Sequence, residues 1–135
     1  MNTSFAFSPY AGIGPIFDHG SLVAWSANVF LEMDMTRAPL RWSSFGSVRG
    51  IGAECADGCD LDGESLGLGV TYLVGNFGVG GGIGLFHQSG SWYAQPHAML
   101  SAGRGAFRTQ LRVEVPQGAY GVSFPILFGF RLPIS

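Results

Sequence analysis

The feature that most constrains the fold is a two-residue alternation of side-chain character along most of the 135-residue chain. In residues 120–132 the even positions are all aromatic or aliphatic, whereas the odd positions are mostly small or polar. Successive side chains of a β-strand point to opposite faces, so this alternation predicts strands with one bulky apolar face. An apolar period of 3.6 residues is nowhere sustained for three turns, so no long helix is predicted.

Eight strands follow from this alternation. It is clear in residues 22–35, 66–75, 77–86, 107–115 and 120–132, and weaker in residues 4–13, 40–52 and 92–102. The connecting segments alternate in character as well. The first, third, fifth and seventh (GPIFDHGS, ECADGCDLDGES, HQSGS and PQGA) are mostly longer, and the others (TRAP, GN and GRG) are tight. An antiparallel up-and-down meander produces this arrangement, and we expect it to form a single domain over residues 1–135.

Composition indicates which face of the sheet meets the solvent. Charged residues make up only 12% of the chain and glycine accounts for 22 residues, so the polar face carries too few charges for a normal wet surface. Eight strands close into a barrel whose interior is just wide enough for side chains. We therefore predict an all-β fold, an eight-stranded antiparallel up-and-down transmembrane β-barrel, with its apolar face toward lipid. A soluble β-sandwich or lipocalin-like barrel, and an open sheet that needs partner chains, are the alternatives.

The aromatic and charged residues sort in the way that a membrane barrel requires. Aromatic residues gather at strand ends, as expected for interfacial girdles: Trp25, Trp92 and Tyr120 at the long-loop end, and Phe5, Phe7, Trp42, Tyr72, Phe77, Phe107 and Phe130 at the short-turn end. We place Asp18, Glu54, Asp57, Asp60, Asp62 and Glu64 in long loops, and the charges within strands on or beside the inward face. No charge then remains for the lipid face, where an arginine costs about 2–4 kcal/mol at mid-depth.

The whole pattern resembles the small eight-stranded outer-membrane β-barrels of bacteria. The resemblance rests on the alternating strands, the tight turns GN and GRG, and the final strand AYGVSFPILFGFRL. That group typically ends on an aromatic residue, whereas Phe130 here is followed by RLPIS. The resemblance implies a bacterial outer-membrane location. The start, MNTSFAFSPY, has no secretory signal, so we interpret the chain as a form from which the signal has been removed; read literally, it is cytosolic.

Charge and composition also bear on partners. A net charge of −2 without a basic face argues against nucleic-acid binding. We expect membrane lipid as the main neighbour, and protein partners or an oligomer in the membrane through the apolar outside. No cofactor is expected.

Polar residues on the inward face form a predicted lumen cluster. It comprises Glu32, Arg41, Arg49, Gln95, His97, Arg108, Arg112, Glu114 and Arg131. One interpretation is that arginines and acids interlock across a glycine floor, because buried charges should be paired. The other is a narrow polar slot that passes or holds a small solute. His97, near Glu114, is interpreted as a satisfied lumen histidine rather than a base.

Three further groups of residues are weaker candidates for a role. Cys55 and Cys59 lie four apart in a turn-rich stretch and are predicted to close a loop disulfide. Asp57, Asp60, Asp62 and Glu64 offer alternate oxygen ligands for calcium, although a solvated loop is the simpler interpretation. His87 and Ser89 have a His-x-Ser spacing similar to that of lipid A deacylases, but Gly90 replaces the asparagine of that family and no matching downstream acid is evident.

Prolines within strands are the last candidate feature. Pro9 and Pro125 belong to the first and last strands, which are neighbours in a closed barrel, and proline removes a ladder hydrogen bond. A seam with missing hydrogen bonds could admit a lipid tail, and in this the chain is similar to the outer-membrane palmitoyltransferases. A bulge or a frayed strand end is the simpler interpretation.

These observations support a non-enzymatic outer-membrane barrel with a structural, anchoring or assembly role. A lipid-modifying acyltransferase or esterase and a small channel are the alternatives.

Overall fold

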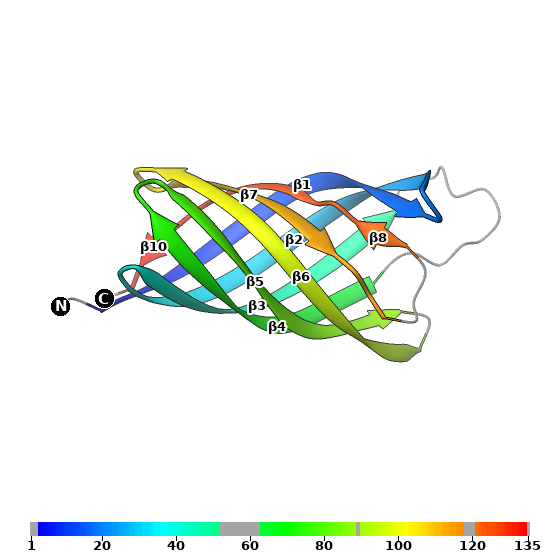
Figure 1. Cartoon of the computed structure of the whole chain (residues 1–135), viewed down its shortest axis with the longest axis horizontal. Coiled ribbons are helices and arrows are strands. Elements are labelled where there is room, and N and C mark those ends of the chain that lie inside the picture. The colour runs from blue at the N-terminus through cyan, green and yellow to red at the C-terminus, as the bar shows by residue number, and fades with distance from the viewer. Residues whose placement is uncertain (1–2, 52–62, 89, 118–120, 135) are drawn as a thin grey trace.

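The computed structural model describes residues 3–51, 63–88, 90–117 and 121–134. All the regular structure in them is β: β1 (Ser4–Asp18), β2 (Ser21–Arg37), β3 (Leu40–Ile51), β4 (Gly63–Val74), β5 (Phe77–Gln88), β6 (Ser91–Arg104), β7 (Phe107–Glu114), β8 (Val122–Ser123), β9 (Ile126–Phe130) and β10 (Leu132–Pro133). Each strand from β1 to β7 pairs antiparallel with the next one along the chain. Figure 1 shows these strands winding around a common long axis.

The segments β8, β9 and β10 together occupy the place of the eighth strand of a closed barrel. We call each of the eight strand positions in the barrel wall a stave. All three pair with β1 in one continuous register, for example Phe7 with Leu132, Ile13 with Ile126 and Phe17 with Val122. On the other side β8 and β9 pair with β7. Closure removes the open sheet edges, which a chain in lipid cannot leave unpaired. The predicted eight-stranded antiparallel barrel is therefore confirmed, and the open sheet is wrong.

The side chains alternate between the inside and the outside as predicted. Along β2 the buried residues are the even-numbered ones from Ala24 to Asp34, and the odd-numbered ones are exposed. Large apolar side chains cover the outer wall from every stave, among them Val29, Val48, Leu68, Ile83, Leu100, Leu111 and Phe128. This is the reverse of a soluble barrel, in which the apolar face is turned inward. The small apolar core inside is formed by Tyr10, Phe30, Phe45 and Leu127.

The two ends of the barrel differ. The start of β1 and the segment β10 lie at the end that carries the β2–β3, β4–β5 and β6–β7 turns (Figure 1); we call this the turn end and the opposite one the loop end. The aromatic residues expected in the girdles that fall in the described part of the chain lie on the outer wall, and all except half-buried Phe7 are exposed. Tyr120 lies outside the described residues.

The predicted length of the first and fifth connections was wrong. β1 continues through Gly14 and Pro15 to Asp18, and the turn that follows it is only His19 and Gly20, with φ angles of 51° and 80°. Positive φ at both positions is typical of a type I′ hairpin turn. The fifth connection likewise spans only the two residues between Gln88 and Ser91. The strands are consequently longer than predicted, up to 17 residues in β2.

Glycines allow neighbouring staves to approach closely at the barrel seam. A Cβ atom built on Gly12 of β1 would overlap the carbonyl oxygen of Ile126, whereas one built on Gly50 of β3 would meet nothing within 4 Å. We predict that Gly12→Ala lowers the free energy of unfolding by about 1–3 kcal/mol or more, because the backbone has to shift.

The matched control, Gly50→Ala, should change it by less than about 0.5 kcal/mol. Both free energies of unfolding are measured by urea titration in detergent micelles, with the folded fraction at each urea concentration read from heat-modifiable migration on a gel. Equal effects of the two substitutions would contradict the close approach at Gly12.

Candidate functional site

The interior of the barrel holds most of the charged groups of the described strands. All nine residues of the predicted lumen cluster occupy inward-facing positions: Glu32, Arg41, Arg49, Gln95, His97, Arg108, Arg112, Glu114 and Arg131. Six of them, all except Arg41, Arg108 and Arg131, are buried. Alternation along the strands puts them there, because an inward side chain recurs at every second residue.

Arg112 of β7 is the central element of this interior. Its Nε lies 3.3 Å from the Glu114 carboxylate, and the residue is 2% exposed. Its guanidinium lies over two rings, 4.7 Å from the centroid of Phe30 and 4.5 Å from that of Phe45. The planar guanidinium suits this arrangement, since it stacks on aromatic faces while its edge donates hydrogen bonds. An ion pair and two rings from three strands thus meet across the barrel.

Gln110 extends this network toward the turn end. Its Oε1 accepts a hydrogen bond from Arg112 at 3.4 Å, and its Nε2 donates to Glu32 at 3.0 Å. Gln110 was absent from the predicted cluster, although it shares the inward parity of Arg108 and Arg112. This parity was the available signal for Gln110, just as the parity of β6 had been for Gln95.

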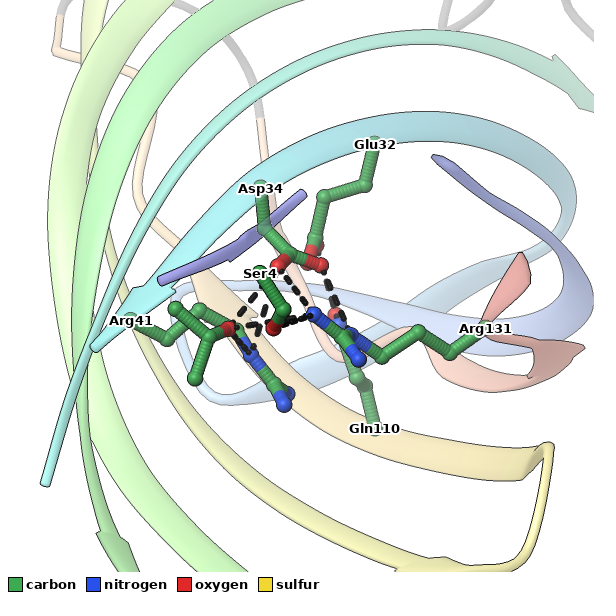
Figure 2. Close-up of polar contacts among 7 residues, drawn as sticks. Ser4, Glu32, Asp34, Arg41, Gln110 and Arg131 are labelled. Atoms are coloured by element: carbon green, nitrogen blue, oxygen red, sulfur yellow. Dashed lines mark hydrogen bonds and ion pairs between the residues drawn. The ribbon is translucent and has the colours of Figure 1, made fainter. Parts of the chain in front are cut away.

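A second network lies at the turn end, as Figure 2 shows. Arg131 holds the Asp34 carboxylate through two hydrogen bonds, of 2.8 and 3.2 Å, and also donates to Ser4. Thr36 donates to Asp34 at 2.9 Å and accepts from Arg41 at the same distance. The network ties β1, β2 and β3 to the chain between β9 and β10. Asp34 lies two residues after Glu32 in β2 and therefore on the same inward face. This alternation was the feature of the sequence that indicated an inward position for Asp34.

The glycine-rich wall of β4 and β5 gives the larger side chains their room. A Cβ on Gly67 would lie 2.8 Å from the ring of Phe45, and one on Gly82 would lie 2.9 Å from the ring of His97. His97 also packs edge-on against Phe45, with 5.2 Å between ring centroids. Its Nδ1 has no hydrogen-bond partner among the described residues, so the geometry differs from the fully satisfied histidine expected.

The loop-end half of the lumen holds Arg49 and Gln95. Arg49 lies over the Phe86 ring, 4.5 Å from its centroid. Gln95 is 2% exposed. The pairing of β6 with β7 sets His97 opposite Glu114. The Glu114 carboxylate accepts a hydrogen bond from Arg112.

His87 lies on the outside of the barrel rather than in a loop. It faces outward near the end of β5, where its Nδ1 is 3.0 Å from Glu64 Oε1 and its ring packs on Trp92 with 4.6 Å between centroids. The placement of Glu64 in a loop was therefore wrong: it is the second residue of β4 and pairs with His87 in the sheet. A charge thus lies on the outer wall, near its loop end. Ser89 lies outside the described residues.

The remaining acidic and cysteine candidates lie outside the described part of the chain. These are Asp57, Asp60, Asp62, Cys55 and Cys59. Within the described ranges, no group of three or more histidine and acidic side chains is arranged to hold a metal ion. No helix in those ranges is long and apolar enough to cross a membrane.

Pro9 and Pro125 both lie along the line where β1 meets the eighth stave. The constant register places Pro9 opposite Phe130, beside the break between β9 and β10, and Pro125 opposite Gly14, in the break between β8 and β9. The second break is bridged from both sides by backbone hydrogen bonds. The backbone N–H of Phe124 donates to the Pro15 carbonyl of β1 at 3.0 Å, and the backbone N–H of Arg112 donates to the Pro125 carbonyl at 3.0 Å. At each proline, therefore, a single backbone hydrogen bond is missing, and the register between β1 and the eighth stave does not shift.

The buried Arg112–Glu114 pair predicts a large and asymmetric effect on stability. Arg112→Met should lower the free energy of unfolding by about 3–5 kcal/mol, because it leaves the Glu114 carboxylate buried without its partner. The double variant Arg112→Met, Glu114→Gln should recover part of this loss. Urea unfolding in micelles measures both, with Arg104→Met at the exposed end of β6 as the control. An equal loss in the double variant would argue against charge burial as the cause.

No protein-family model matches the chain, and no curated protein matches it in sequence. Solved structures match it in fold, among them the following two. The crystal structure of Neisserial surface protein A (NspA) has a TM-score of 0.70 and 13% sequence identity, over 98% of this chain and 99% of that one. The Yersinia pestis outer membrane protein Ail, in a phospholipid bilayer nanodisc, has a TM-score of 0.57 and 14% identity, over 94% of this chain and 99% of that one.

These identities are low, so the similarity concerns the fold. The chain folds as a small eight-stranded β-barrel of the outer-membrane kind, as the resemblance in its sequence predicted.

Proposed function

We propose that the chain is an integral protein of the bacterial outer membrane with a structural, anchoring or assembly role, and that its interior does not conduct ions. The exposed apolar wall supports residence in lipid, since a continuous band of this kind is unfavourable in water. The fold neighbours support the same location, because Ail is named as an outer membrane protein and its structure is that of a bilayer-embedded chain.

The observation that carries the non-conducting interpretation is the packing around Arg112. Its guanidinium lies against Phe30 and Phe45, and all three side chains are buried in the interior. An ion that passed this level would have to displace an aromatic stack and a buried ion pair. A closed interior leaves the outer wall and the two ends of the barrel as the surfaces for interaction with lipid and protein.

This proposal predicts no conductance. The purified chain, reconstituted in a planar bilayer, should give no current above the leak of the bilayer, whereas Phe45→Ala combined with Arg112→Ala should give one. Heat-modifiable gel migration establishes that both forms are folded. Discrete current steps from the unmodified chain would contradict the proposal and favour the small channel.

A second candidate function, a lipid-modifying esterase or acyltransferase, is favoured by the Glu64–His87 contact. The sequence offered no acid to orient His87, and Glu64 lies 3.0 Å from its Nδ1 on the outer wall. A carboxylate at Nδ1 leaves Nε2 free to act as a base toward a hydroxyl nucleophile. Ser89, two residues further along the chain, is the candidate nucleophile.

This second function predicts a specific loss of activity. Release of fatty acid from lipid vesicles by the reconstituted chain should fall at least tenfold in His87→Ala and in Glu64→Gln. His19→Ala is the matched control, because His19 forms a similar exposed pair with Asp18 at 2.9 Å. Absence of activity in the unmodified chain, or an equal loss in the control, would exclude this function.

A further inference from the structure

The described charges are distributed unevenly along the barrel axis. Five of the seven arginines lie at or near the turn end: Arg37, Arg41, Arg104, Arg108 and Arg131. Among the described residues, the carboxylate that contacts any of them is that of Asp34. The turn end is therefore strongly cationic, and its potential favours small anions.

A cavity of about 150 Å³ opens among these arginines, inside the turn end. It is lined by Arg41 and Arg108, by Ser101 of β6, and by residues of the β4–β5 and β6–β7 turns, including Asn76. Cavities of this size hold several waters or one small polar ligand. The lining offers hydrogen-bond donors from β3, β6, β7 and a turn.

The two arginines that line this cavity have little negative charge against them. Arg108 donates to the backbone carbonyls of Gly105 and Phe107, and no described carboxylate lies within ion-pair distance of it. Arg41 bonds through Nε to Thr36 and lies 3.8 Å from Asp34. The carboxylate oxygens of Asp34 are already bonded to Arg131 and Thr36. Two guanidinium groups thus border one cavity without full neutralisation.

Glycines leave the space in which these donors lie. A Cβ on Gly103 would overlap the Arg108 guanidinium, and a Cβ on Gly78 would lie 2.6 Å from the Ser101 hydroxyl oxygen. Any larger residue at Gly103 would therefore force the Arg108 side chain to move. The position of Arg108 in the mouth of the barrel depends on this glycine.

We propose that the cavity between Arg41 and Arg108 binds a phosphate-class oxyanion. Guanidinium groups present several N–H donors in a fixed plane and recognise phosphate through paired hydrogen bonds. Donors of two arginines and a serine that line one cavity fit the several oxygens of a tetrahedral anion better than the two oxygens of a planar carboxylate. The anion is supplied either as free phosphate or as the headgroup of a phospholipid in the leaflet at the turn end.

The test is calorimetric titration of inorganic phosphate into the folded chain in nanodiscs of phosphatidylcholine, at constant ionic strength. We expect saturable binding that weakens at least tenfold in Arg41→Gln, in Arg108→Gln and in Gly103→Ala. Arg37→Gln is the matched control, because it removes an exposed arginine from the same end but outside the cavity lining. It should leave the affinity unchanged. Heat-modifiable migration on a gel establishes that each variant is folded.

Several results would overturn the proposal: no saturable binding, an equal loss in Arg37→Gln, or equal affinity for acetate and phosphate. The source of the anion follows from repeating the titration in micelles of a phosphate-free sugar detergent, because phosphatidylcholine itself carries a phosphodiester headgroup. A higher apparent affinity in the micelles supports a lipid headgroup as the occupant, and an unchanged affinity supports the free anion.

Discussion

The closed hydrogen-bond ladder between β1 and the eighth stave is the constraint on which the rest of the structure depends. A wall that faces lipid has no water to satisfy open backbone groups, so every stave must be paired on both sides. Register holds from Phe7 opposite Leu132 to Phe17 opposite Val122, even though Pro9 and Pro15 have no backbone N–H to donate along this line and Pro125 has none to donate toward β7. The prolines cost individual hydrogen bonds, and the continuous register preserves the barrel.

Closure at eight staves makes the interior narrow, and this explains its chemistry. A long inward side chain finds space beside a glycine of the neighbouring strand, as where the ring of Phe45 lies on Gly67 and that of His97 on Gly82. Arg112 is buried in this space and combines an ion pair with aromatic stacking. Glycine abundance and the use of arginine are in this way two consequences of one narrow barrel.

The charges that remain after this packing lie mainly at the two ends. At the turn end Asp34 is shared among arginines, and the cavity beside Arg41 and Arg108 is left cationic. Near the loop end the Glu64–His87 pair lies on the outer wall and packs on Trp92. Under the proposed function, the interior contributes stability, whereas the ends offer the groups that can meet a ligand.

Alternation in the sequence by itself determined the fold class, the inward or outward direction of each strand residue, and thereby the members of the lumen cluster. These properties are local, because the parity of a strand depends only on its own residues. Turn lengths and partners were decided by the tertiary structure. The alternation does not reveal that His19 and Gly20 can close a tight turn, which lets β1 run on past Pro15. It also does not give the register that sets Glu64 opposite His87. Nor does it show that Arg131 contacts Asp34, from which it is separated by 97 positions in the sequence. Such contacts depend on how far each stave is staggered against the next, and barrel closure fixes that stagger for all eight staves together.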